Sequence, residues 1–179
     1  METLQVEGPW TVAQRDALPD DGRRYEVVDG VLLVSPAPRP AHQGVVALLW
    51  HLLHDAAPSG LRVYFAPLDV VLAGDTVVEP DVLVAPREAF TDLNLPSAPL
   101  LAVEVLSPGT RMIDLNLKKQ RYERAGIPSY WVIDPDTLVL TVFERRDGTY
   151  AGVAEVGPGQ SWTAERPFPV TITPEDLRY

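Results

Sequence analysis

The alternation of apolar and polar positions near the N-terminus predicts a β-hairpin. Residues 25–28 (Tyr-Glu-Val-Val) and 31–34 (Val-Leu-Leu-Val) flank the dipeptide Asp29-Gly30. Asp-Gly favours a two-residue turn with positive φ angles, and the twist of that turn matches the twist of paired strands. We therefore expect a hairpin over residues 25–34.

A helical pattern follows the hairpin. Residues 35–40 contain three prolines and break regular structure, and apolar residues then recur with helical spacing from Ala41 up to Pro58. They are Val45, Leu48, Leu49, Leu52 and Leu53. This spacing predicts a helix with one face in the core.

Four apolar runs after this helix predict strands, at residues 61–66, 68–72, 77–85 and 100–106. The last run is interrupted only by Glu104, which is typical of a central strand covered on both faces. A second helix is expected from Thr110 to Gly126, because glycine favours the left-handed conformation that ends helices.

The remaining pattern completes an α/β fold. Strands are expected at residues 130–133, 138–144 and 150–156, with a turn at residues 134–137. This pattern gives an α/β sandwich, a mixed β-sheet flanked by two α-helices, with an N-terminal β-hairpin. The chain has 179 residues, 46% of them apolar, so we expect a single domain with its core at about residues 20–145 and a C-terminal β extension over residues 146–179.

Charge bears on possible partners. The net charge of −10 counts against nucleic acid, because an acidic protein repels a polyanion at long range. Residues 111–124 nevertheless carry more basic than acidic side chains. Arg111, Lys119 and Arg121 are therefore candidates for contacts with phosphates, although a solvated helix face has the same composition.

Compartment is inferred from what the sequence lacks. It has no Cys, which excludes disulfides and thiolate metal sites but says little about compartment. Its first residues contain neither a basic nor an apolar region of a secretory signal, and the longest apolar stretch, Val45 to Trp50, is far shorter than the roughly 20 residues of a membrane span. We expect a cytoplasmic protein without membrane contact.

Two acids lie within apolar runs, Asp81 and Glu104. Burying an unpaired carboxylate is costly, so each needs a cation or hydrogen-bond donors. If their strands are neighbours, the two carboxylates and the main-chain carbonyl of Val105 form an oxygen-rich half-shell suited to Mg²⁺ or Mn²⁺. Such an ion activates water and neutralises charge on a phosphate.

The second helix offers a cation for this centre. Thr110, Asp114 and Lys118 are spaced by four residues and lie along one helical stripe, so Lys118 can point back to the strand end. Lys119 is the alternative, about 100° further round the helix. The spacing favours Lys118, and Asp114 is expected to pair with it.

The chain also carries an ordered set of family motifs. They are Tyr25-Glu26 with Asp29-Gly30, His42, Pro80-Asp81-Val82, Val103-Glu104-Val105-Leu106-Ser107-Pro108, Thr110, Asp114, Lys118, Tyr122, Gly126 and Ile127-Pro128-Ser129-Tyr130-Trp131-Val132-Ile133-Asp134. Over roughly residues 10 to 145, this set resembles the Uma-type family of bacterial restriction-endonuclease-like proteins, within the PD-(D/E)XK nuclease superfamily.

The resemblance implies the restriction-endonuclease-like fold, a mixed β-sheet flanked by α-helices. It also implies a Mg²⁺-dependent endonuclease that cleaves DNA, with a homodimer as the usual state of double-strand cutters. Asp81 and Glu104 match the metal-binding acids, and Glu26 matches an accessory acid. The lysine that usually follows the acid by two residues is replaced here by Leu106, and the resemblance places it at Lys118 instead.

Other interpretations remain open. Glu26 could simply pair with Arg23 or Arg24, and His42 could either reach the site or cap its helix. His51, His54 and Asp55 have the spacing of metal ligands but lack a third histidine. Ser107 lacks the surroundings of a nucleophile, and the aromatic residues Tyr122, Tyr130 and Trp131 suit a core.

Two further function classes compete with the endonuclease. One is a nuclease-like fold, catalytically weak or inactive, that binds nucleic acid or protein, which the acidic surface favours. The other is a metal-dependent hydrolase of small phosphoesters.

Overall fold

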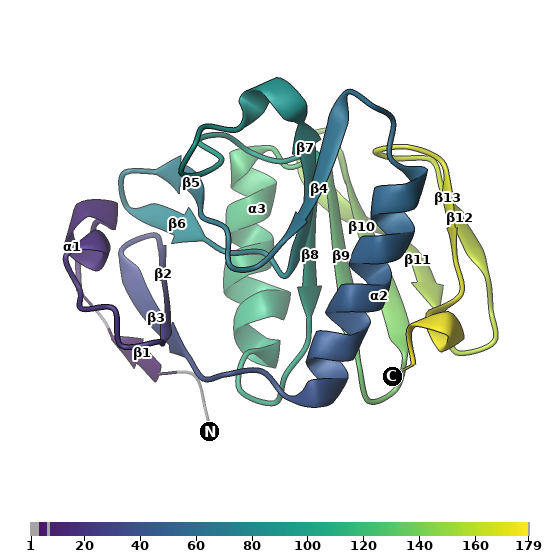
Figure 1. The fold of residues 1–179 in the computed structure, drawn as a ribbon, viewed down its shortest axis with the longest axis horizontal. Helices are drawn as coiled ribbons and strands as arrows, with labels where there is room; N and C mark the ends of the chain where they lie inside the picture. The colour runs from purple at the N-terminus through teal and green to yellow at the C-terminus, as the bar shows by residue number, and fades with distance from the viewer. Residues whose placement is uncertain (1–3, 7, 179) are drawn as a thin grey trace.

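A six-stranded mixed sheet forms the centre of the computed structural model, which describes residues 4–6 and 8–178 (Figure 1). In this sheet β8 and β9 run parallel, and the other neighbouring strands run antiparallel. The carboxyl ends of β8 and β9 therefore meet at the same end of the sheet. Its spatial order is β11 (Thr149–Val156), β10 (Val139–Arg146), β9 (Ser129–Asp134), β8 (Leu101–Val105), β7 (Val82–Pro86) and β4 (Leu61–Phe65).

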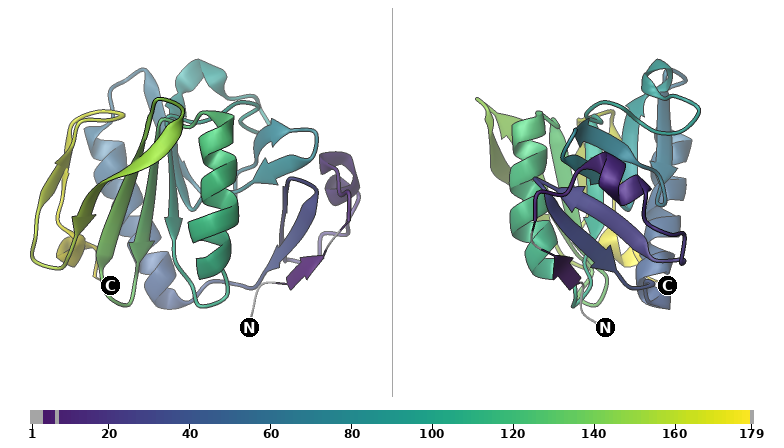
Figure 2. Two further views of the ribbon diagram at one scale, coloured as in Figure 1. Left: turned by 180° about the vertical axis from the view of Figure 1, so that it is seen from behind. Right: turned by 90° about the vertical axis from the view of Figure 1, so that its left-hand side faces the viewer.

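Helices cover both faces of this sheet (Figures 1 and 2). The longer helix, α2 (Pro40–Ala56), packs its apolar stripe on one face, and α3 (Lys119–Ala125) lies against the other. The expected mixed α/β architecture with two flanking helices is confirmed.

Side chains alternate along β8, so successive residues point to opposite faces of the central sheet. Val103 and Val105 belong to the buried cluster that includes α2, whereas Ala102 belongs to the cluster of α3. Glu104 has the same parity as Ala102, so its side chain points to the α3 side.

The second helix contains a π-helical segment. Ile113–Lys118 forms π-type turns directly before α3, and Gly126 ends the helix in the left-handed region with φ of 80°. The helix is confirmed in its extent, but the pattern gave no sign of the π segment. Such segments are frequent at functional sites because they redirect side chains locally.

The expected hairpin is confirmed and belongs to a second, five-stranded sheet. Its turn residues Asp29 and Gly30 have φ angles of 49° and 79°, as a primed turn requires. The spatial order of this sheet is β1 (Leu4–Val6), β3 (Val31–Ser35), β2 (Arg24–Val28), β6 (Thr76–Val78) and β5 (Val70–Ala73).

The prediction of one continuous strand over residues 77–85 is wrong. The run divides into β6 and β7, which belong to different sheets, with Glu79, Pro80 and Asp81 between them. Proline has no N–H to donate to a strand partner, so Pro80 favours an interruption. This break places Asp81 where the two sheets meet.

The C-terminal segment lies beside α2, on the same face of the central sheet (Figure 1). Ala164, Phe168, Ile172 and Leu177 are buried in the same apolar cluster as Leu49 of α2. This segment comprises β12 (Trp162–Ala164), β13 (Val170–Ile172) and the 3-10 helix η3 (Pro174–Leu177).

Two short helices complete the described elements, α1 (Val12–Asp16) and the 3-10 helix η1 (Arg87–Ala89). None of the helices in residues 4–6 and 8–178 has the length and apolar character needed to cross a membrane.

Candidate active site

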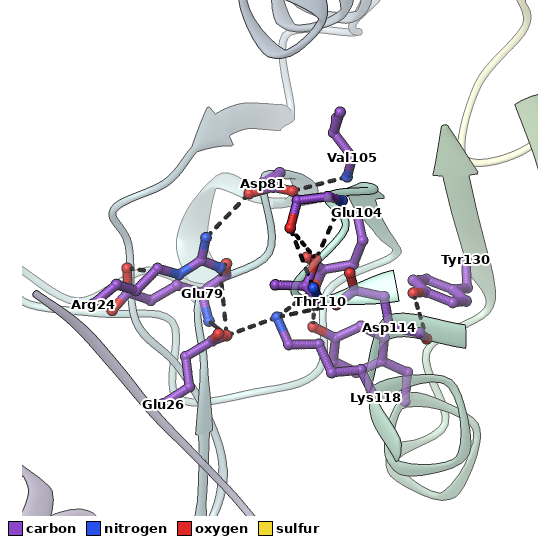
Figure 3. A network of polar contacts seen from close by, with 12 residues as sticks. Arg24, Glu26, Glu79, Asp81, Glu104, Val105, Thr110, Asp114, Lys118 and Tyr130 are labelled. Atoms are coloured by element: carbon purple, nitrogen blue, oxygen red, sulfur yellow. Dashed lines mark hydrogen bonds and ion pairs between the residues drawn. The ribbon is translucent and has the colours of Figure 1, made fainter. Parts of the chain in front are cut away.

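Asp81 and Glu104 lie side by side at the junction of the two sheets (Figure 3). The antiparallel register of β7 and β8 pairs Val82 with Val103, so the residues one step further, Asp81 and Glu104, are opposite one another. Both are buried, with 4% and 2% of their surface exposed. The fold thus brings together the two acids that the sequence analysis singled out.

Asp81 is held by donors on three sides. Its Oδ2 accepts a hydrogen bond from the Val105 N–H at 2.8 Å and lies 3.2 Å from His42 Nε2, while its Oδ1 accepts one from Arg24 at 3.1 Å. Burial opposes the charge, but the contact with His42 and the charge of Arg24 hold the pKa of Asp81 below its usual range. The carboxylate is therefore ionised and fixed in orientation.

Val105 also matters for its carbonyl group. In a strand the N–H and C=O of one residue point to the same side. Because the Val105 N–H faces Asp81, the Val105 carbonyl lies on the same edge of β8. The three oxygen donors expected from the sequence thus share one region of the structure.

Glu104 has a different environment. Its Oε1 accepts hydrogen bonds from the Tyr122 hydroxyl at 2.6 Å and from Lys118 Nζ at 3.0 Å. Burial raises the pKa of Glu104 to about 8; Lys118 opposes this shift, and the charges of Asp81 and Asp114 add to it. Burial therefore disfavours the ionised form of Glu104, and Lys118 compensates for this only in part.

Lys118 lies inside the acidic cluster, and Lys119 lies outside it. Lys118 Nζ is 2.9 Å from Glu26 Oε1 and 3.0 Å from Glu104 Oε1, whereas Lys119 Nζ stands 3.7 Å from the ring centroid of Phe143. Burial disfavours the ammonium ion, but Glu104 and Glu26 raise the pKa of Lys118 above its ordinary value. Lys118 is therefore a charged amine aimed at the strand end.

The π-helical segment positions the side chains around Lys118. Asp114 Oδ1 is 3.9 Å from Lys118 Nζ, and the Asp114 carbonyl accepts a hydrogen bond from the Tyr130 hydroxyl at 3.0 Å. Burial raises the pKa of Asp114 to about 6, with Lys118 acting in the opposite direction. The expected pairing of Asp114 with Lys118 is thus long, and Lys118 contacts Glu26 and Glu104 more closely.

Arg24, which the sequence offered as a partner of Glu26, has a central position together with Glu79 that was not expected. The Arg24 guanidinium lies 3.1 Å from Asp81, 3.4 Å from Glu26 and 3.6 Å from the Glu79 carboxylate, and it also donates to the Glu79 main-chain carbonyl. Arg24 and Glu26 are two residues apart on β2 and so share a face. That alternation was the available signal, since it places an arginine beside the accessory acid.

Tyr122 was expected to be a core aromatic residue, and it is fully buried. Its hydroxyl has a polar role as well, because it donates to Glu104. Nothing in the local pattern around Tyr122 distinguishes this role from simple packing.

The donor chemistry fits a divalent metal ion, although no preformed set of ligands is present. In the described part of the chain, no three His, Asp or Glu side chains converge on one point as metal ligands do. The carboxylates instead contact internal cations. However, the acids outnumber the cations Arg24 and Lys118, and oxygen donors with excess negative charge suit Mg²⁺ or Mn²⁺. The acids are Glu26, Glu79, Asp81, Glu104 and Asp114.

The expected basic strip on the second helix does not form a continuous exposed surface. Arg121 is buried, lies 3.2 Å from Asp29 and donates to Thr76 Oγ1, so it cannot meet a phosphate as we expected. Lys119 packs on Phe143. Arg111 pairs with Asp134 and keeps 49% of its side chain exposed.

The alternative metal and nucleophile candidates lie apart from this cluster. His51 and His54 are exposed on α2 and lie 3.6 Å and 3.5 Å from the Asp55 carboxylate. Ser107 exchanges hydrogen bonds with Thr110 at the start of the second helix, which is an ordinary turn. Neither group contacts Asp81 or Glu104.

Comparisons with known proteins support the fold. The family model Uma2, described as "Putative restriction endonuclease", matches residues 12–176. A crystal structure from Anabaena variabilis, described as a "putative nuclease belonging to DUF820", matches with a TM-score of 0.77 and 19% identity over 94% of this chain and 97% of that chain. A comparison with curated proteins finds no match. The expected restriction-endonuclease-like fold is confirmed.

The different surroundings of the two neighbouring lysines predict different effects on stability. Lys118→Met leaves Glu26 and Glu104 without their shared cation, so we expect the free energy of unfolding to fall by about 3 kcal/mol or more. Lys119→Met removes one cation–π contact and should cost about 1 kcal/mol or less. Urea denaturation followed by circular dichroism measures both, and equal losses would contradict the assignment of Lys118 to the buried cluster.

Proposed function

The chain belongs to the Uma2 family of restriction-endonuclease-like proteins, and from this premise we propose that it is a metal-dependent endonuclease that hydrolyses phosphodiester bonds of DNA. The observation that carries the proposal is the convergence of Asp81, Glu104 and Lys118 at the carboxyl end of β8. Two carboxylates and an amine in one buried cluster match the requirements of phosphodiester hydrolysis.

Mg²⁺ or Mn²⁺ is the proposed cofactor. Asp81 and Glu104 would hold it, with the Val105 carbonyl as a further oxygen donor. When bound, the ion supplies activation of the attacking water and neutralises charge on the scissile phosphate. The carboxylates, which carry more negative charge than Arg24 and Lys118 balance, favour the uptake of such a cation.

The protein's own side chains supply hydrogen-bond donors and hold the reacting groups in position. Lys118, fixed by Glu26 and Glu104, presents N–H donors that can orient a water molecule or stabilise a phosphate oxygen. His42 and the Val105 N–H hold Asp81 in one orientation. Glu26 therefore acts through Lys118, and His42 acts through Asp81; we propose both as positioning residues.

Two arginines at the same end of the sheet are candidates for contacts with the DNA backbone. Arg111 pairs with Asp134 at the end of β9, and Arg39 pairs with Asp136 in the following turn; each keeps 49% of its side chain exposed. Because β8 and β9 are parallel neighbours, this turn lies beside the end of β8 that carries Glu104. We propose that Arg39 and Arg111 bind phosphates.

Cleavage is the first test of the proposal. Purified protein should nick plasmid DNA with Mg²⁺ or Mn²⁺ and not with EDTA. Asp81→Asn and Glu104→Gln should each reduce the rate by at least about 100-fold, since loss of an outer-sphere partner alone costs about 10- to 100-fold. Glu165→Gln, an exposed acid in the C-terminal segment, should keep the wild-type rate. Equal activity of wild type and Asp81→Asn would assign the cleavage to a contaminant.

Binding of DNA provides a second, independent test. Arg39→Gln combined with Arg111→Gln should weaken binding of an oligonucleotide duplex and lower the slope of log affinity against log salt by about 1 to 2, because each phosphate contact contributes about 0.9. Arg146→Gln is the matched control, since Arg146 is 62% exposed at the opposite end of the sheet. Fluorescence anisotropy at several salt concentrations measures the slopes. An equal effect of Arg146→Gln would contradict the proposal that Arg39 and Arg111 bind phosphates.

We further propose a homodimer as the state that acts on duplex DNA, because one site per chain cleaves one strand at a time. Sedimentation velocity in the presence of a duplex and Ca²⁺ should give a complex with two protein chains. A complex with a single chain at saturating protein would contradict this part of the proposal.

One observation favours the alternative of a nuclease-like binding module without turnover. Arg24 already contacts Asp81, so the acid is neutralised without a metal ion. DNA binding that depends on Arg39 and Arg111, together with no metal-dependent cleavage, would support this alternative.

A further inference from the structure

Arg24 places a positive charge where a divalent ion would contact Asp81. Its Nη1 is 3.1 Å from Asp81 Oδ1, and its Nη2 is 3.4 Å from Glu26 Oε1 and donates to the Glu79 carbonyl (Figure 3). A guanidinium has several N–H donors in a fixed plane, so one side chain can contact these acids together. Arg24 thus offsets the charge of Asp81 in the absence of metal.

Lys118, the other internal cation, does not contact the Asp81 carboxylate. Lys118 contacts Glu104 through Oε1, the same oxygen that Tyr122 contacts, and is 4% exposed. Among residues 4–6 and 8–178, Glu104 Oε2 takes no hydrogen bond. Competition between a metal ion and an internal cation is therefore centred on Asp81 and Arg24.

We propose that Arg24 is an internal counter-ion that competes with the divalent metal for Asp81, so that metal binding requires the guanidinium to leave this carboxylate. The inference rests on the proposed function, because it takes Asp81 as a metal ligand. It adds that the metal-free protein holds Asp81 paired with Arg24.

The displaced guanidinium can keep one of its present partners. The Arg24 Nε already lies 3.6 Å from the Glu79 carboxylate, and 25% of the Arg24 side chain is exposed. Arg24 can therefore keep Glu79 as its partner while it gives up Asp81.

The exchange links stability to metal affinity. In the metal-free protein Arg24 offsets the repulsion among Asp81, Glu26 and Glu79, so its removal should destabilise that state. The same removal frees Asp81 Oδ1 for a metal ion. A variant without Arg24 should be less stable alone and bind metal more tightly.

The test compares Arg24→Gln with Arg23→Gln by calorimetric titration of Mn²⁺ and by thermal denaturation with and without Mn²⁺. Arg23→Gln removes the same charge from the adjacent residue, which is 65% exposed and pairs with Asp21. We expect Arg24→Gln to bind Mn²⁺ about tenfold more tightly or better, with a lower Tm without metal and a larger rise in Tm on adding Mn²⁺. Arg23→Gln should match the wild type within about twofold.

Arg24→Lys separates direct competition from general electrostatics. It keeps the charge but loses the fork that contacts Asp81 and the Glu79 carbonyl together, so we expect Mn²⁺ binding between that of the wild type and Arg24→Gln. If Arg24→Gln does not fold without metal, recovery of folding on adding Mn²⁺ supports the proposal. If it does not fold with Mn²⁺ either, the affinity of Arg24→Lys decides.

Unchanged or weaker Mn²⁺ binding in the Arg24 variants would overturn the inference, because Arg24 would then support the metal site and not compete for it. This outcome leaves the proposed function intact as long as wild type binds Mn²⁺ and Asp81→Asn does not. If neither the wild type nor either Arg24 variant binds Mn²⁺, the result would instead contradict the proposed metal site itself. Binding by Arg24→Gln alone would support the inference and identify Arg24 as a block to the metal.

Discussion

The repulsion among carboxylates buried at the junction of two sheets is the constraint on which the rest of the structure depends. Asp81, Glu104 and Glu26 have almost no contact with water, and each would be costly to ionise alone. Arg24 and Lys118 bring two positive charges into the cluster from different elements, a strand of the hairpin and a π-helical turn. The cluster is stable only while both elements stay in place against the central sheet.

Other contacts hold those two elements together. Asp29, in the turn of the hairpin, pairs with Arg121 and Arg124 of α3. Arg121 is therefore a structural tie between the element that carries Arg24 and the helix that follows Lys118, which explains its burial. Thr76 of β6 joins the same contact, since its hydroxyl receives the Asp29 N–H and the Arg121 side chain. The positive charge predicted for DNA contact serves instead to align the two halves of the site.

The sequence predicted the parts of this arrangement that depend on local pattern. The Asp29-Gly30 hairpin and the Gly126 helix end follow from backbone preferences at single residues, and the spacing of Lys118 was enough to favour it over Lys119. What it could not predict depends on distant partners. The break at Pro80 reflects the meeting of two sheets, and the position of Arg24 depends on which strand pairs with β6. The spacing of apolar residues reveals neither of them.

Internal neutralisation also explains how an acidic site can persist before its proposed cofactor binds. Without cations, the carboxylates would have to take up protons or separate. Burial already raises the pKa of Glu104, and Lys118 opposes this shift only in part. Arg24 offsets the charge of Asp81, yet it does so by using an oxygen that a metal ion needs. A site that is stable when empty and still able to bind a cation requires a counter-ion that can be displaced. Arg24, whose side chain is 25% exposed, meets that requirement, and Lys118, whose side chain is 4% exposed, does not.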